Sequence, residues 1–141
     1  MNETSAIPSI EELRRVAAAV GRETGCRLLV LFGSAARPDA PAPRDVDLAV
    51  LAEGKLDTVE LTNRLIRALG FQAVDIADLR HADPLLMMLV ARDGVPLYES
   101  SPGEFDRFAS LAVRRYADTR KFRAVEAQEV RDFIAAGQTQ S

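Results

Sequence analysis

The stretch VLFGSAARPDAPAPRDVDLAVL, residues 30–51, decides the fold, because it holds two apolar segments joined by a proline-rich loop. The first segment ends in Gly33-Ser34, and ten residues later Asp45 and Asp47 open the second segment. Short, continuous apolar segments predict buried strands. The loop is too short to hold a crossover helix, so we expect the two strands to be neighbours in one sheet, antiparallel or nearly so.

The rest of the chain alternates between helical and strand patterns, which predicts the α/β (α+β) class, with a small mixed β-sheet flanked by helices. Capping residues, apolar spacing and turn residues set the bounds of each element. The expected helices cover residues 9–20, closed by Gly21; 57–69, closed by Gly70; 84–92; and, as one long C-terminal helix, about 103–136. The expected strands cover residues 27–32, 46–51, 72–77 and, at an edge, 95–99.

The length of 141 residues and a hydrophobic content of 48% are sufficient for one buried core. We therefore expect a single domain over residues 1–137 and a disordered tail at 138–141. Met87 and Met88 lie in an apolar segment, where core packing is the expected role.

Charge and cysteine content narrow the functional classes. The net charge of −3 gives no support for direct nucleic-acid binding, which needs a basic surface. The longest apolar run, residues 85–91, is far shorter than the roughly 20 residues that cross a bilayer, and the N-terminus lacks a signal-peptide pattern. Cys26 is the single cysteine, which fits a reducing compartment and a small core residue. We expect a soluble, cytoplasmic protein with no membrane partner.

Two aspartates at the start of the strand at 46–51 give the first chemical signal. Side chains alternate along a strand, so Asp45 and Asp47 share one face at its entrance. Two carboxylates this close repel each other unless a divalent cation lies between them. Mg²⁺ prefers one or two carboxylates together with water and phosphate oxygens. The pair therefore predicts a magnesium site, whereas the simpler interpretation is a capped turn.

Gly33 and Ser34 predict a phosphate-binding turn at the end of the neighbouring strand. Gly33 allows a ligand to approach the backbone closely, or allows a positive φ. Backbone N–H groups at the start of a turn bind phosphate, the Ser34 hydroxyl adds a donor, and Arg37 adds positive charge. With the carboxylate pair, these residues predict a nucleoside triphosphate site. The simpler interpretations are a helix cap for Ser34 and a surface position for Arg37.

A third carboxylate, Asp75, lies in the strand at 72–77. It shares a face with two alanines, whereas Val74 and Ile76 point to the other face. A charge among small neighbours is explained if Asp75 is a third metal ligand or a general base beside the aspartate pair. Asp78 is a nearby competitor for this role.

Two further features stay open. Residues 114–123, RRYADTRKFR, hold five basic residues and one acidic residue. The simpler interpretation is a solvated helix face, and the alternative is a surface for nucleotide phosphates or for an acidic partner. His81 lies in a predicted loop, where an exposed position is expected.

The order Gly-Ser, ten residues, Asp-x-Asp resembles the signature of the nucleotidyltransferase superfamily related to DNA polymerase beta. Arg37, the later segments VDIADL and DPLLMMLVARDGVPLYE and the basic helix resemble, more narrowly, the minimal nucleotidyltransferases of the MntA type. These are antitoxins encoded beside HEPN-domain toxins of the HepT type. The similarity covers about residues 10–125. Arg44 departs from the family, which more often has Ser there, and could pair with a phosphate or with Asp45.

The resemblance implies Mg²⁺ and ATP bound at the edge of a mixed sheet. Asp45 and Asp47 would match the metal-binding pair, Asp75 the third catalytic carboxylate, and Gly33 and Ser34 the triphosphate-binding turn. The implied reaction transfers AMP from ATP to a tyrosine hydroxyl of a partner HEPN-type ribonuclease toxin and neutralises that toxin.

Two alternatives remain. A small-molecule nucleotidyltransferase of the antibiotic-modifying type is disfavoured because the short chain leaves no second domain to enclose an acceptor. A non-catalytic antitoxin that masks the toxin by binding has no need of three clustered carboxylates.

Overall fold

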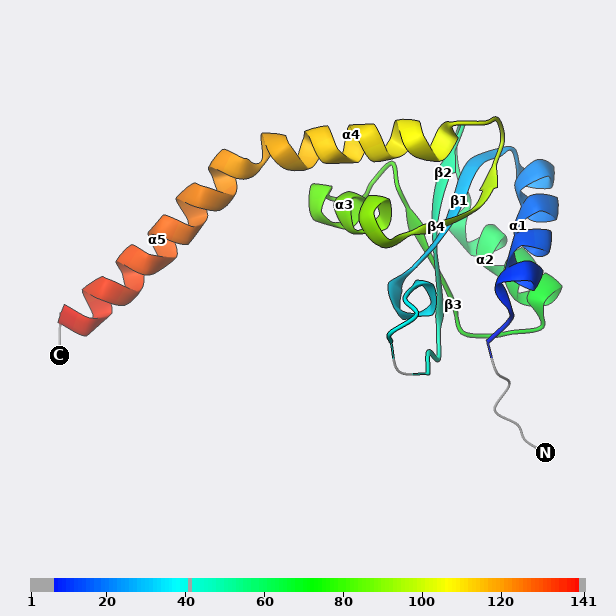
Figure 1. Ribbon diagram of the computed structural model, residues 1–141, viewed down its shortest axis with the longest axis horizontal. Coiled ribbons are helices and arrows are strands. Elements are labelled where there is room, and N and C mark those ends of the chain that lie inside the picture. The colour runs from blue at the N-terminus through cyan, green and yellow to red at the C-terminus, as the bar shows by residue number, and fades with distance from the viewer. Residues whose placement is uncertain (1–6, 41, 140–141) are drawn as a thin grey trace.

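The computed structural model describes residues 7–40 and 42–139, which form a four-stranded sheet with helices on both faces (Figure 1). The expected α/β class with a mixed sheet is confirmed. In chain order the elements are α1 (Ile10–Thr24), β1 (Cys26–Phe32), the 3₁₀ helix η1 (Gly33–Ala36), β2 (Val46–Ala52), α2 (Thr58–Leu69), β3 (Val74–Asp78), α3 (Pro84–Asp93), β4 (Val95–Glu99), α4 (Glu104–Asp118) and α5 (Arg120–Thr139).

The strand order in the sheet is β3-β2-β1-β4. β1 pairs antiparallel with β2, as expected for strands joined by a short loop. β1 also pairs antiparallel with β4, whereas β2 pairs parallel with β3. The parallel pair needs a crossover, and α2 supplies it. Pro96 lies in β4, an edge strand, where a residue without an N–H group is tolerated.

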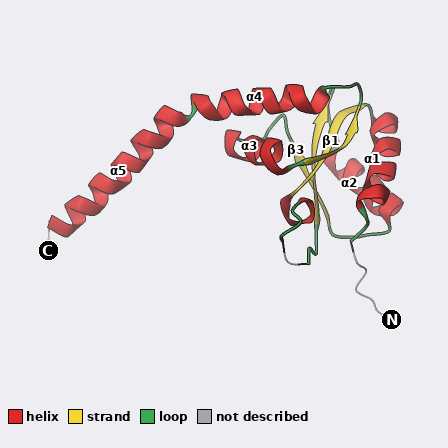
Figure 2. Cartoon of the chain, in the orientation of Figure 1, coloured by secondary structure: helices red, strands yellow, loops and turns green. Residues whose placement is uncertain are grey.

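Helices α1 and α2 cover one face of the sheet, and α3 and α4 cover the other (Figure 2). The central strands are therefore buried on both sides, which explains their continuous apolar sequence. Cys26 is 2% exposed in the first core, and burial raises the pKa of its thiol, so the expected role as a core residue is confirmed. Met87 is buried in the second core as expected, and Met88 is half-buried.

The expected end of the first helix at Gly21 is wrong. α1 continues to Thr24, and Gly25 caps it in the left-handed conformation, with φ of 71°. Gly21 lies within the helix, at a position where a Cβ atom would overlap the ring of Tyr98 on β4. The absence of a side chain at Gly21 thus serves close packing of α1 against the sheet.

The expected long C-terminal helix is present over residues 104–139, but it is not continuous, because it divides into α4 and α5 at Thr119. The Thr119 hydroxyl donates to the Tyr116 carbonyl at 2.7 Å, and Arg123 donates to the same oxygen at 3.0 Å. These side-chain bonds compete with the regular helical pattern. α5 leaves the body of the protein in a new direction (Figure 1).

The remaining differences are small. β3 begins at Val74, two residues later than expected, and α3 extends to Asp93. Of the tail expected to be disordered, residues 138 and 139 end α5, and residues 140 and 141 lie outside the described part of the chain. None of the helices in the described residues combines the length and hydropathy needed to cross a membrane.

Candidate functional site

The strand registers bring three predicted residues to one end of the sheet. The antiparallel register places Phe32 of β1 beside Asp47 of β2, and the parallel register places Asp47 beside Asp75 of β3. Gly33 follows Phe32 directly, and Asp45 lies just before β2. The turn after β1 and the carboxylates of β2 and β3 are therefore neighbours across three adjacent strands.

Gly33 and Asp47 are in close contact. Gly33 has a φ of 74°, a conformation that other residues adopt only with strain. A Cβ atom at this position would also overlap Oδ2 of Asp47. Glycine is thus required both by the backbone and by the carboxylate beside it, so a single ligand can touch the turn and Asp47 together.

The turn itself is the short helix η1, with Phe32 as its N-cap. The first N–H groups of a helix have no partner within that helix and can donate to a phosphate. Ser34 lies inside η1 rather than at its cap position, and its hydroxyl makes no hydrogen bond to the described residues. Its oxygen is therefore available to a ligand.

The three carboxylates repel one another. Burial raises the pKa of Asp47, and the negative charges of Asp75 and then Asp45 raise it further. Asp47 is half-buried, whereas Asp45 and Asp75 are exposed. Within the described residues none of the three accepts a hydrogen bond or forms an ion pair. A bound cation would relieve this repulsion.

The donor set suits a cation that takes ligands from its substrate. In the described residues, no three carboxylate, imidazole or thiolate groups lie close enough together to hold a metal ion by themselves. The expected set of three protein ligands is therefore not assembled by side chains alone. Mg²⁺ is commonly held by one or two carboxylates, with water and phosphate oxygens completing its octahedron, and Asp45 with Asp47 fits that pattern.

The structure separates Asp75 from its competitor Asp78. Asp78 lies beside Val50 in the parallel register, away from Asp47. Its carboxylate accepts a hydrogen bond from the Arg80 N–H at 3.0 Å and lies 3.8 Å from His81. His81 is exposed, as expected.

Arg37 lines a cavity of about 250 Å³. Arg92, which was not identified from the sequence as a candidate site residue, lines the same cavity. Gly33, Arg37 and Arg92 line this cavity together, and the Arg92 guanidinium pairs with Asp93 at 2.8 Å. A basic residue in the last turn of a helix ordinarily complements the helix dipole, so no pattern in the sequence singles out Arg92. Arg44 is exposed and pairs with no acidic group among the described residues, so a pair with Asp45 is not formed.

Comparisons with known proteins identify the family of the chain. Residues 16–103 match the family model described as polymerase beta, nucleotidyltransferase. The protein adenylyltransferase MntA of Aphanizomenon flos-aquae (strain 2012/KM1/D3) is 28% identical, over 91% of this chain and 94% of that protein.

Two solved structures have similar folds. One is the tri-AMPylated Shewanella oneidensis HEPN toxin in complex with its MNT antitoxin, with a TM-score of 0.69 and 27% identity over 86% of this chain and 98% of that chain. The other is a toxin-antitoxin crystal structure with AMP-PNP, with a TM-score of 0.70 and 26% identity over 87% of this chain and 98% of that chain.

Proposed function

Because the chain belongs to the polymerase beta nucleotidyltransferase family, we propose that it is an antitoxin that transfers AMP from ATP to a tyrosine hydroxyl of a partner HEPN-type toxin. One observation carries the proposal: Asp47 lies between the Gly33 turn and Asp75 at one end of the sheet. The similarity to an adenylyltransferase and to an antitoxin bound to its AMPylated toxin supports the choice of acceptor.

The proposed reaction replaces one bond at phosphorus by another. The tyrosine oxygen attacks the α-phosphorus of ATP and forms a new P–O bond. The bond from the α-phosphorus to the oxygen bridging to the β-phosphate breaks, and pyrophosphate leaves with the electron pair. The hydroxyl proton passes to a base, for which Asp75 is the candidate, unless Asp75 completes the metal ligands instead.

The residues of this chain chiefly bind and orient the two substrates. The N–H groups of η1, the Ser34 hydroxyl and the Arg37 guanidinium are proposed to hold the triphosphate. Asp45 and Asp47 are proposed to hold Mg²⁺. When bound, Mg²⁺ would neutralise charge that develops on the phosphate oxygens.

The position of the site favours a protein as acceptor. Asp45 and Asp75 are exposed, and β3 is an edge strand. Within the described residues no further domain covers this end of the sheet (Figure 1). The acceptor surface is then supplied by the partner. We place the reaction in the cytoplasm, where ATP is present and Cys26 stays reduced.

Label transfer tests the proposal. The purified protein is incubated with its partner toxin, Mg²⁺ and ATP labelled at the α-phosphate. We expect label on the toxin, and we expect Asp47→Asn to lower the rate by about 10²-fold or more, because the metal-binding pair is broken. Asp118→Asn, at an exposed position on α4, is the matched control and should keep the full rate.

Two results would contradict the proposal. An undiminished rate of toxin labelling by Asp47→Asn would show that the reaction does not depend on the proposed metal site. Absence of label from the toxin, with full neutralisation by both variants, would instead establish masking of the toxin by binding.

A further inference from the structure

A second cavity, of about 460 Å³, lies at the opposite end of the sheet from Asp47. The β1–β2 register pairs Phe32 with Asp47 at the site and Leu28 with Leu51 near the other end, where Leu51 lines the cavity. Five arginines line the cavity, together with one carboxylate and an apolar group of side chains. The arginines are Arg27, Arg80, Arg107, Arg114 and Arg115, the carboxylate is Glu104, and the apolar residues are Leu51, Leu79, Met87, Phe108 and Leu111.

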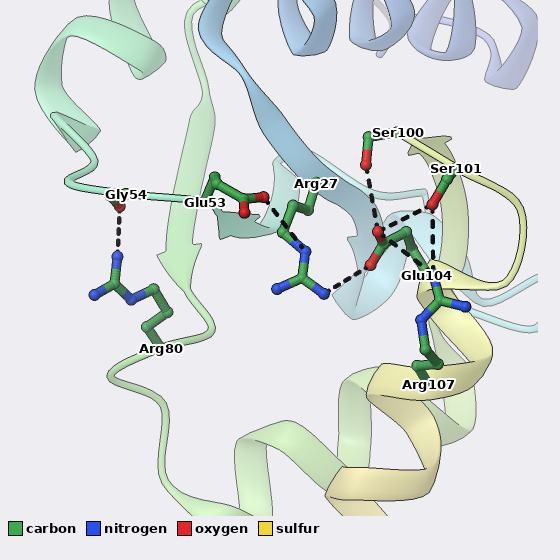
Figure 3. Close-up of polar contacts among 8 residues, drawn as sticks. All are labelled: Arg27, Glu53, Gly54, Arg80, Ser100, Ser101, Glu104 and Arg107. Atoms are coloured by element: carbon green, nitrogen blue, oxygen red, sulfur yellow. Dashed lines mark hydrogen bonds and ion pairs between the residues drawn. The ribbon is translucent and has the colours of Figure 1, made fainter.

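Glu104 accounts for two of the five arginines. It is 7% exposed, and its carboxylate lies 3.0 Å from the Arg27 guanidinium and 3.4 Å from that of Arg107 (Figure 3). Burial raises the pKa of Glu104, but the hydrogen bond and charge of Arg27, with smaller effects of Ser101 and Arg107, lower it by more. This network joins the start of α4 to β1 and has a structural role.

The other three arginines have no such role. Arg80 donates to the carbonyl of Gly54, which leaves its charge uncompensated (Figure 3). Arg114 and Arg115 are exposed and form no ion pair with the described residues. Several uncompensated guanidinium groups around one cavity repel one another. The cavity is therefore locally positive, although the chain as a whole has a net charge of −3. An anion in the cavity would relieve that repulsion.

The lining indicates which anion fits. Guanidinium groups bind phosphate through paired, charge-assisted hydrogen bonds. The apolar part of the lining, in which Leu51 and Leu111 are half-buried and Phe108 is buried behind the surface, matches a heterocyclic base rather than a second charge. The volume lies within the range of about 300–1,000 Å³ typical of small-molecule sites, and one inorganic phosphate would leave most of it empty.

We propose that this cavity is a second nucleotide-binding site, which takes a nucleoside monophosphate with its phosphate on Arg80, Arg114 and Arg115 and its base on the apolar lining. The site holds its ligand without the carboxylates of the transfer site, so its binding is independent of metal. An acidic segment of a partner protein would use the arginines and leave the apolar lining unfilled.

Calorimetric titration of AMP into the Asp47→Asn protein with EDTA tests the proposal, because the metal site is then disabled. We expect AMP to bind more tightly than inorganic phosphate. Replacing both Arg114 and Arg115 with Ala should raise the Kd for AMP by about tenfold or more, since charge-assisted bonds are lost. The control replaces both Arg14 and Arg22 with Ala; these residues are exposed on α1, on the other face of the sheet. This double variant loses the same charge and should leave the Kd for AMP unchanged.

Three results would overturn the proposal: no binding of AMP, AMP binding no tighter than inorganic phosphate, or equal weakening by the two double variants. Loss of toxin binding by the Arg114 and Arg115 variant, without AMP binding, would assign the arginines to an acidic partner. Thermal melts of both variants verify that each is folded. Label transfer is measured separately on the protein with Asp47 intact, so failure of one proposal is distinct from failure of the other.

Free AMP and AMP joined to tyrosine carry the same base, but the phosphate is a monoester in free AMP and a diester with a single negative charge in adenylyl-tyrosine. A titration with adenylyl-tyrosine separates these two sources, and only this comparison rests on the proposed function. A lower Kd for adenylyl-tyrosine would identify the modified toxin as the ligand, and a lower Kd for AMP would identify the free nucleotide.

Discussion

Gly33 and Asp47 depend on each other at the scale of single residues. The positive φ of Gly33 turns the chain at the end of β1, and its missing side chain leaves room for the Asp47 carboxylate. Asp47 in turn bears an unfavourable charge, because it is half-buried beside Asp45 and Asp75. The unfavourable charge of Asp47 lowers stability, and such local costs cluster at functional sites.

We expect Gly33→Ala to abolish label transfer and to lower the free energy of unfolding by roughly 1–2 kcal/mol through backbone strain, and by more if Asp47 cannot move. Gly25→Ala is a matched control, because Gly25 has a φ of 71° and nothing lies within 4 Å of an added Cβ atom. It should lose comparable stability in a denaturant titration and keep its activity. Equal activities of the two variants would show that contact with Asp47 is unimportant.

Asp47→Asn should raise the melting temperature at neutral pH when no divalent cation is present. The folded state holds a proton on Asp47 to a higher pH than the unfolded state, whose pKa is near the ordinary 3.8. The free energy of unfolding therefore falls as pH rises through this interval, and at neutral pH the full penalty remains. Thermal melts check this, with Asp118→Asn as control.

Addition of Mg²⁺ with ATP should stabilise the wild-type protein more than Asp47→Asn, because a ligand stabilises the state that binds it.

A lower melting temperature for Asp47→Asn than for the wild-type protein, measured without divalent cations, would show that the Asp47 carboxylate is not destabilising.

At the scale of elements, tertiary packing and side-chain bonds set helix boundaries that the apolar pattern of the sequence does not indicate. Gly21 was expected to end the first helix, but it lies inside α1, where the Tyr98 ring occupies the place that a side chain would take. Thr119 sits in a continuous helical pattern, yet side-chain bonds to the Tyr116 carbonyl divide the helix there. In both cases the deciding partner is a specific contact, whereas apolar spacing reports only the average environment of a face.

Gly21→Ala separates these effects. In an open helix position that unfolds with the rest of the protein, the change from Gly to Ala stabilises by about 1 kcal/mol. Gly137→Ala is the control, because nothing lies near an added Cβ atom and α5 adds little to the core, so we expect the free energy of unfolding to stay within about 0.5 kcal/mol. At Gly21 the overlap with Tyr98 should reverse the sign and destabilise by about 1–3 kcal/mol. Chemical denaturation measures both variants. A gain at Gly21 would mean that the Tyr98 ring moves aside without cost.

At the scale of the whole molecule, α5 stands apart from the three-layer body (Figure 1). Residues 120–137 are all exposed, and large apolar side chains such as Phe122 and Phe133 remain in solvent, 73% and 80% exposed. α5 therefore adds little to the core. Arg123 is the exception, because its guanidinium caps α4 and lies 4.0 Å from the centre of the Tyr116 ring.

A chain shortened to residues 1–123 should unfold at the same free energy as the full chain, within about 0.5 kcal/mol, because residues 124–137 are all exposed. A chain shortened to residues 1–119 also loses Arg123 and should be less stable by about 0.5–1.5 kcal/mol. Denaturant titration of the two forms distinguishes these cases. A large loss already in the longer form would mean that α5 packs on the body.

The sequence by itself determined the mixed sheet and most of the candidate site. Apolar segments and capping residues are local properties, so β1, β2 and α2 could be predicted within about two residues. Gly33, Ser34, Asp45 and Asp47 could be identified because they lie close together in the chain, at the ends of two predicted strands.

Only the tertiary structure decided the rest. The parallel register of β2 and β3 places Asp75, and not Asp78, beside Asp47, and packing of α3 brings Arg92 to the cavity beside Gly33. The cavity around Arg114 and Arg115 likewise joins segments that are distant in the chain. Register and packing depend on long-range contacts, which the order of residues in one segment does not record.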